Sequence, residues 1–440
     1  MDTAPRDARP ARLPSGSLTA IVDQAVNSGG SFLTTVIMAR ALHLHGFGTY
    51  SLLFAAILTL NGLVNTIGSE PVRTLGVAGS PRLRRQYAGA QLLAVTAVAV
   101  PTALLLALAL LGFLHLGVDA AAAVGTALLS ACLFETMRAL GASRHEWRHI
   151  LIADCAAQGV KLSALALLLA SDAVSVPLAF WALALSTLSG ALMLRALGIV
   201  GTRPTRAYFL QQMRAHLRYG KWLTLESVVF VLSTQLYLYL IALLVDVPSA
   251  GGFNAAQTLV NAVNLLWMGI TAYAMSTGRG ILIEQGALAW RTWLMRTGTS
   301  LLVAVALVLV LISLAAHPLL AALFSPRFAQ YAYQVPLLAL AALATAGNGL
   351  LSVAFRTLEM PQMGFRGKAL SALVTAVIAY PLVSNLGTTG AAIGMIVTQI
   401  CWASVYLWGL NRIQADWAGR VERLRMAHAG ERQRFEAEVP

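Results

Sequence analysis

The sequence has few charged residues for its length. Only 11% of its 440 residues are Asp, Glu, Lys or Arg, whereas 58% are hydrophobic, and the mean hydropathy is +0.71. Soluble domains carry about 25% charged residues, so this chain has too little polar surface for a water-soluble fold. Lipid tolerates such a surface, and the composition therefore predicts an all-α polytopic membrane protein.

Acidic residues are especially scarce, with 18 against 31 basic ones, which gives a net charge of +13. In a soluble protein this balance would indicate nucleic acid. Here the basic residues lie in short segments between apolar runs, which is typical of membrane topology, so we expect no nucleic-acid partner. The three cysteines lie inside apolar runs without a pairing pattern, and a G-x-x-x-x-G-K-[ST] motif, which a P-loop ATPase requires, does not occur.

Apolar runs long enough to cross a bilayer need about 20 residues, and the chain has twelve candidates in two sets of six. The first set lies near 18–41, 48–68, 87–113, 118–138, 149–170 and 174–194. The second lies near 221–245, 250–276, 298–316, 331–352, 367–386 and 390–411. We expect no cleaved signal peptide, because the first run is long and is retained as a membrane helix.

The two sets predict two six-helix lobes around a central cavity, related by an axis along the membrane normal. The expected division is a cytoplasmic N-terminal segment 1–17, an N-lobe 18–196, a cytoplasmic linker 197–220, a C-lobe 221–412 and a charged cytoplasmic tail 413–440.

Basic residues are distributed unequally between the two sides of this map. If the amino terminus is cytoplasmic and the helices alternate, 28 of the 31 basic residues lie in cytoplasmic segments. Only Arg40 and Arg327 face outward, and Lys161 lies within a helix. The positive-inside rule therefore predicts a multi-pass protein of the bacterial inner membrane with both termini in the cytoplasm.

Polar side chains form stripes on the first two helices of each half. They are Asp23, Asn27, Ser31 and Thr34; Asn61 and Asn65; Glu226, Ser233 and Gln235; and Asn254, Gln257, Asn261 and Asn264. One interpretation is that they join helices by hydrogen bonds. The other is that they line a water-filled cavity between the halves, which would make Asn27, Asn61, Asn65, Asn254, Gln257 and Asn261 substrate-binding residues.

Charged residues inside a membrane usually face a cavity or a partner because their insertion costs about 2.5–3.5 kcal/mol. Lys161 shares a helix face with Asp154 and Gln158, so it either binds a substrate phosphate or pairs internally with Asp154 or Glu135. Arg40 either meets an anionic head group or extends to the membrane surface. Asp23, Glu226 and Asp154 are candidates for coupling to H⁺ or Na⁺. We expect no other cofactor.

The segment His145–His149 matches H-E-x-x-H, a zinc-binding pattern when it lies on a helix. Arg144 and Arg148 flank it and disfavour a divalent cation, and a third ligand is not evident. We therefore predict no metal site here.

Several short motifs resemble the polysaccharide-export and O-antigen flippases (Wzx-like) of the multidrug/oligosaccharidyl-lipid/polysaccharide (MOP) exporter superfamily. They are Ala39-Arg40-Ala41-Leu42, Gly46-Phe47-Gly48-Thr49-Tyr50-Ser51, Tyr219-Gly220-Lys221, Gly252-Phe253-Asn254-Ala255-Ala256-Gln257 and Gly387-Thr388-Thr389-Gly390-Ala391-Ala392-Ile393-Gly394. The resemblance covers nearly the whole chain, in order. It implies a two-lobed bundle that flips an undecaprenyl-pyrophosphate-linked glycan between leaflets by alternating access, with membrane lipid, a glycan polymerase and a chain-length regulator as partners.

The predicted function is therefore a flippase in exopolysaccharide or O-antigen biosynthesis, and we expect no enzymatic activity. One alternative is a small-molecule antiporter of the same superfamily, whose binding site would be mostly apolar and aromatic. Another is a membrane enzyme: a glycan polymerase, which would be expected to carry a large outer loop, or a zinc intramembrane protease.

Overall fold

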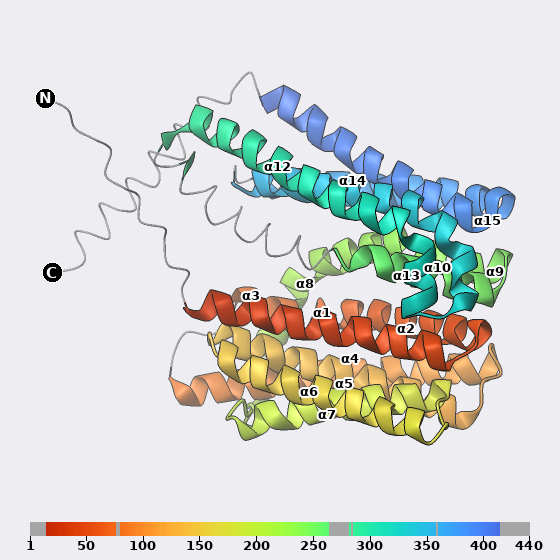
Figure 1. Cartoon of the computed structure of the whole chain (residues 1–440). Coiled ribbons are helices and arrows are strands. Elements are labelled where there is room, and N and C mark those ends of the chain that lie inside the picture. The colour runs from red at the N-terminus through yellow and green to blue at the C-terminus, as the bar shows by residue number, and fades with distance from the viewer. Residues whose placement is uncertain (1–14, 76–79, 264–280, 283–284, 358–359, 414–440) are drawn as a thin grey trace, which may run out of the picture.

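The protein is almost entirely helical in the part described by the structure, a computed structural model (Figure 1). The described residues are 15–75, 80–263, 281–282, 285–357 and 360–413. Among these residues there is no β-strand. Helices are expected, because in lipid a helix satisfies every backbone hydrogen bond within one segment.

The described residues of the first half form seven helices. They are α1 (Ser15–Ala41), α2 (Leu44–Asn65), α3 (Ser69–Leu75), α4 (Pro81–Gly112), α5 (Val118–Ser143), α6 (Trp147–Ala170) and α7 (Val176–Ala196). Hydroxyl caps fix two of their starts: Ser80 accepts from the backbone N–H of Leu83, and Ser175 from that of Leu178, each with a proline in the first turn.

The second half is more interrupted. Its elements are α8 (Arg206–Thr234), α9 (Leu236–Leu244), α10 (Val247–Asn261), α12 (Ala287–Leu314), α13 (Ala316–Leu323), the 3-10 helix η1 (Pro326–Gln334), α14 (Val335–Thr357) and α15 (Pro361–Ile413). The second part of the predicted linker, from Arg206, belongs to α8. The predicted span 250–276 begins with α10, and its part beyond residue 263 lies outside the described residues.

The helix α15 covers two predicted spans, 367–386 and 390–411, and the chain turns between them at Gly387. Gly387 has φ 59° and ψ −136°, a backbone conformation that residues with a Cβ rarely adopt. The turn falls at the Gly387–Gly390 motif, as the two separate predicted spans require.

The twelve-helix architecture predicted from the sequence is confirmed. Eight helical stretches in the described residues are long and apolar enough to cross a membrane, and one of them, Met363–Leu410, contains both halves of α15. The remaining predicted spans correspond to α1, to α8 together with α9, and to α10. These helices carry polar stripes, which lower their hydropathy.

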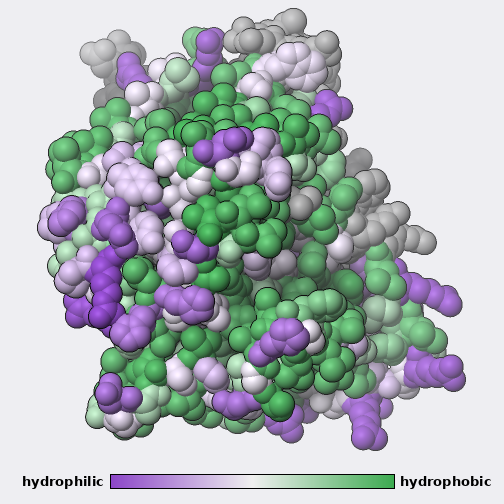
Figure 2. Space-filling view, turned by 90° about the vertical axis from the view of Figure 1, so that its right-hand side faces the viewer, coloured by the Kyte–Doolittle hydropathy of each residue, from purple (hydrophilic) through white to green (hydrophobic). Residues whose placement is uncertain are grey.

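The helices form two groups, which we call the N-lobe (α1–α7) and the C-lobe (α9–α15), with α8 between them (Figure 1). We call the end where α1 begins and α15 ends the inner end, following the predicted topology. At the opposite, outer end, α2 packs along α10 across the lobe boundary. Figure 2 views this outer end, where hydrophilic side chains lie among hydrophobic ones.

The turn at Gly387 gives a test of the fold. We expect Gly387→Ala to destabilise the protein by about 1–3 kcal/mol, because alanine is strained at this φ and ψ. Unfolding in a denaturing detergent, followed by circular dichroism, measures the loss. The control is Gly159→Ala, at a helical position where an added Cβ meets no atom within 4 Å. Equal stability of the two variants would contradict the strained turn.

Candidate functional site

Arg138 of α5 is the centre of a buried ionic cluster in the N-lobe. Its guanidinium lies 3.1 Å from Asp23 of α1, 2.9 Å from Asp154 of α6 and 2.8 Å from Glu135, one turn earlier on α5. The Asp23 and Asp154 side chains are buried, Asp154 completely. One half-buried cation thus holds carboxylates from three helices, and the two buried ones, Asp23 and Asp154, would be costly without it.

Two amides extend this cluster along the α1–α6 contact. Asn27 Nδ2 donates to Asp154 Oδ2 at 2.7 Å, and Gln158 Nε2 donates to Asn27 Oδ1 at 3.0 Å. Gly30 permits the close approach, because a Cβ at this position would overlap the Gln158 amide. The structure therefore brings together Asp23, Asn27 and Asp154, three of the residues selected from the sequence.

Lys161 lies on the same face of α6 as Asp154 and Gln158, and only 6% of it is exposed. The internal ion pair considered from the sequence is not formed, and both of its candidate partners, Asp154 and Glu135, pair with Arg138. Within the described residues, Lys161 makes no ion pair. Lys161 is thus a buried cation with no charged partner in the described part of the chain.

Three oxygens of the cluster and its amide extension are without a hydrogen-bond donor in the described part of the chain. Asp23 Oδ1, Asp154 Oδ1 and Gln158 Oε1 are buried and accept no hydrogen bond from the described residues. A hollow of about 380 Å³ reaches Asp23 and Arg138 and is also lined by His145 and Trp147, next to the loop between α5 and α6. Of the residues with unpaired oxygens, Asp23 therefore lies beside a hollow near the inner end.

Arg40, a predicted substrate-binding residue, lies at the outer end and joins the two lobes. Its guanidinium donates to the backbone carbonyls of Leu323 and Ala322, at the end of α13. A cation is stabilised there, since the last carbonyls of a helix carry partial negative charge. Arg327 makes a second contact between the lobes, to the His43 ring. Both of the outward-facing basic residues predicted from the sequence thus connect the lobes.

Close packing completes this outer contact between α2 and α10. Gly48 and Gly251 face each other so closely that a Cβ on either would meet backbone of the opposite helix at 3.0 Å or less. Asn254 Nδ2 donates to Ser51 Oγ at 2.9 Å, and the rings of Phe47 and Phe328 meet edge to face with centroids 5.4 Å apart. The lobes are therefore in firm contact at the outer end.

The other predicted binding residues do not join the ionic cluster. Asn61 lies on α2 with its Oδ1 buried and unpaired among the described residues, and Asn65 accepts from Ser69 at 2.6 Å. On α10, Gln257 is half-buried, whereas Asn261 is exposed at the end of the helix. Glu226 lies on α8, but its side chain is outside the described residues.

Helix α8 contacts helices of both lobes. His216 lies against Tyr87 and Gln91 of α4, at 3.1 and 2.9 Å, and Thr224 shares a hydrogen bond with Thr66 at 2.7 Å. Burial lowers the pKa of His216, which precedes the predicted span 221–245, although its contact with the carbonyl of Ile67 opposes this shift. The neutral ring is therefore favoured at neutral pH.

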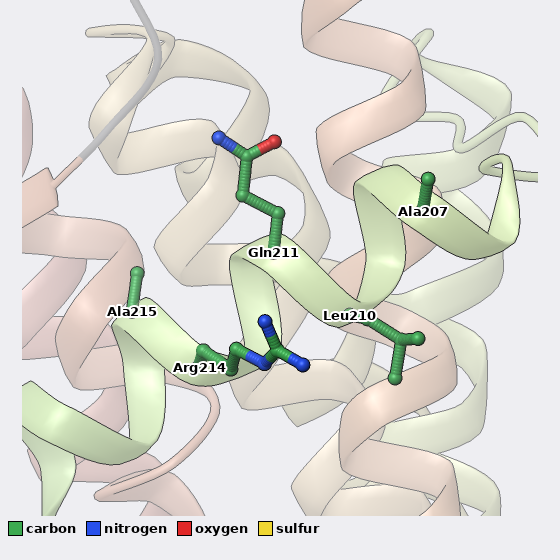
Figure 3. A pocket seen from close by; sticks show the side chains of 5 residues that line it. All are labelled: Ala207, Leu210, Gln211, Arg214 and Ala215. Atoms are coloured by element: carbon green, nitrogen blue, oxygen red, sulfur yellow. The ribbon is translucent and has the colours of Figure 1, made fainter.

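A second hollow, of about 460 Å³, lies beside the start of α8 (Figure 3). It is lined by Ala207, Leu210, Gln211, Arg214 and Ala215, all from this helix. Arg214 is exposed and adds a positive charge to the inner end. Nothing in the sequence separated it from the other cytoplasmic basic residues.

The H-E-x-x-H segment does not lie on one helix. His145 has φ 58° and precedes α6, whereas His149 lies within its first turn. The two rings therefore lack the common helical face that this zinc motif requires.

No family model matches the sequence, and no curated protein does so significantly. Solved structures match over most of the chain. An inward-facing multidrug resistance MATE family transporter of the MOP superfamily has a TM-score of 0.70 at 14% identity, covering 91% of this chain and 99% of its own. The lipid II flippase MurJ, in an inward closed conformation, has a TM-score of 0.70 at 8% identity, covering 90% and 87%.

The chain has the fold of the MOP-superfamily transporters. An outward-facing MATE structure gives a lower TM-score, 0.60, at 15% identity and with 91% and 94% of the chains covered. Within the MOP fold, the ionic cluster lies inside the N-lobe, and the Arg40 and Arg327 contacts lie where the lobes meet.

We expect Arg138→Ala to destabilise this MOP fold by about 3–5 kcal/mol, since it leaves two buried carboxylates without their cation. Adding Asp154→Asn should restore part of the loss. Unfolding in a denaturing detergent measures both. Exposed Arg148 supplies the control, because Arg148→Ala should change stability by less than about 0.5 kcal/mol. An Arg138→Ala protein as stable as this control would show that the cluster does not hold the three helices.

Loss of the Arg40 contact should open the outer end. Arg40→Ala removes charged hydrogen bonds worth about 1.5–3 kcal/mol, so we expect at least about tenfold faster outside labelling of a cysteine placed at buried Ser51. A membrane-impermeant thiol reagent measures this rate, with labelling of the native cysteines subtracted using the parent protein. Arg82→Ala, at the exposed start of α4, is the control. An unchanged rate would mean that Arg40 does not hold the outer end closed.

Proposed function

We propose that this protein is a flippase that moves a polyprenyl-pyrophosphate-linked oligosaccharide from the cytoplasmic to the periplasmic leaflet by alternating access. In this proposal the glycan head group travels between the lobes while the lipid tail stays in the bilayer. The pathway would be exopolysaccharide or O-antigen biosynthesis in the bacterial inner membrane. Both termini would be cytoplasmic, and a glycan polymerase and a chain-length regulator would act on the product.

The observation that carries this proposal is Lys161. Lys161 is buried and has no charged partner among the described residues. Burial of such a cation costs several kcal/mol, and no internal ion pair offsets this cost. Such a cation suits an anionic cargo, because an ammonium group binds phosphate as a compact point charge. The excess of basic residues near the inner end, including Arg214, supports loading of the same cargo from that side.

The ionic cluster supplies the coupling step of the proposal. Protonation of Asp23 or Asp154, or binding of Na⁺ at their unpaired oxygens, would change how many charges Arg138 must balance. The contact between α1 and α6 would respond, because Asn27 and Gln158 hydrogen-bond directly within it. A proton or cation would then favour one arrangement of the lobes by its differential affinity.

A small-molecule antiporter is the second candidate, because the structural match to a multidrug resistance MATE transporter has the same TM-score as the match to MurJ. The two candidates differ in cargo charge. Lys161 would repel a cationic drug at short range, whereas it would attract a diphosphate.

The test uses the full chain in vesicles that contain a fluorescent undecaprenyl-diphosphate disaccharide, with transfer between leaflets measured by a membrane-impermeant quencher. We expect Lys161→Ala to slow transfer by about tenfold or more, the cost of losing one charge-assisted contact. Lys161→Arg, which keeps the charge, should retain most of the rate.

Dye efflux from the same vesicles separates the two candidates. Transport of a cationic dye, without transfer of the disaccharide lipid, would establish the antiporter. Asp154→Asn isolates the coupling step, since it should remove the dependence of transfer on an imposed pH or Na⁺ gradient. Undiminished dependence would exclude Asp154 from coupling.

A further inference from the structure

A groove of about 490 Å³ runs along the C-lobe between α12, α14 and the second part of α15. Small residues from all three helices form part of its lining: Gly298, Gly347 and Ala403. A Cβ added at Gly347 would meet no atom within 4 Å, so the space above this residue is open. The groove thus exists because these three positions lack large side chains.

The groove is lined mostly by apolar side chains and is open at the surface of the lobe. Leu302 and Leu407 also line it, and Leu407 is 54% exposed. The three helix segments lie within the predicted membrane spans 298–316, 331–352 and 390–411 or directly beside them. At this depth the medium is hydrocarbon, so the natural occupant is a lipid chain.

An amide pair closes the groove on the side that faces the protein interior. Asn348, which is 1% exposed, donates from Nδ2 to the backbone carbonyl of Gln399 at 2.9 Å and to its Oε1 at 3.0 Å. These hydrogen bonds join α14 to α15. The groove is therefore a shallow trough on the lobe surface, suited to a chain that lies along it.

A positive charge marks the inner end of the trough. Arg291, Leu294, Gly298 and Leu302 follow one another at helical spacing on a single face of α12, and the last three line the groove. Arg291 is exposed, lies one turn nearer the inner end, and makes no ion pair with the described residues. An arginine just beyond a chain-sized trough is complementary to a lipid phosphate.

We propose that this trough binds one acyl chain of an anionic phospholipid, with the phosphate held by Arg291. The helix α12 packs on α10, α13 and α14 of its own lobe, and the last part of α15 lies on the side of the C-lobe that faces away from the N-lobe (Figure 1). The trough therefore lies on a different surface from the contact between the lobes. A membrane phospholipid therefore fits the trough better than does the lipid tail of a cargo whose head group lies between the lobes. The proposal does not depend on what the protein transports.

Because the surrounding lipid is as apolar as the trough, packing alone gives little preference, and the arginine provides the selectivity. One arginine near anionic lipid contributes enough for about a fivefold preference. A leucine at position 347 would occupy the trough and should weaken chain binding by about tenfold.

The experiment is native mass spectrometry of the detergent-purified full chain with added phosphatidylglycerol or phosphatidylcholine at equal concentration. We expect the wild type to retain one phosphatidylglycerol per chain, about fivefold more than phosphatidylcholine. Gly347→Leu should retain about tenfold less phosphatidylglycerol than the wild type, and Arg291→Ala should bind both lipids equally. Gly159→Leu is the matched control, because a Cβ there also meets nothing within 4 Å, but on α6 of the other lobe.

Ala403→Phe fills the same trough from α15, and it decides the matter if Gly347→Leu does not purify as a folded monomer. Wild-type lipid binding by a folded trough-filling variant would overturn the proposal. So would a wild type that does not distinguish the two lipids, or a protein dimer that Gly347→Leu or Ala403→Phe dissociates, since a second copy of the chain would then occupy the trough.

Discussion

The arrangement of the N-lobe depends on one guanidinium group. Arg138 binds carboxylates from α1, α5 and α6, and two of them, Asp23 and Asp154, are buried. In an interior of low dielectric, removal of the cation would leave charges that no neighbouring helix can solvate. Three helices therefore meet where Arg138 can reach all its partners. Asn27 and Gln158 extend this arrangement by hydrogen bonds, and the missing Cβ of Gly30 leaves room for the Gln158 amide.

The two lobes differ in the kind of polar group they bury. The N-lobe buries an ionic cluster, whereas the described part of the C-lobe buries neutral groups, such as Asn348 against Gln399 and Thr375 against Thr398. Neutral pairs hold helices together without responding to protons or cations. Any electrostatic response to H⁺ or Na⁺ in the proposed cycle is therefore expected in the N-lobe rather than in the described part of the C-lobe.

The sequence predicted the helices well, since hydropathy and the Gly387 turn depend only on local residues. It also selected Asp23, Asn27, Asp154 and Lys161, because charges and amides at helical spacing are unusual in apolar runs. Arg138 was missed. It lies at the predicted end of span 118–138, where the positive-inside rule already explained a basic residue, but α5 continues to Ser143 and keeps it inside the lobe. Its spacing of three from Glu135 was the available signal.

Helix packing was the part that local patterns could not supply. The polar residues of α2 and α10 do meet, as Ser51 and Asn254 show, but they do so at the outer contact and away from the ionic cluster. Which stripes converge depends on close approaches such as Gly48 with Gly251, and these are set by long-range packing. A hydrogen-bonding stripe and a cavity-lining stripe have the same periodicity, so sequence alone left both interpretations open.

Helix α1 connects the ionic cluster, on which the proposed coupling relies, with the Arg40 contact that joins the lobes at the outer end. Asp23 and Asn27 lie near its start, and Arg40 lies at its end, 17 residues from Asp23 and therefore about 26 Å along the axis. In the proposed cycle, a change in charge at Asp23 would alter what holds α1 against α5 and α6, and a resulting shift of α1 would act on the Arg40 contacts to Ala322 and Leu323. No separate relay is needed, because a single helix belongs to both sites.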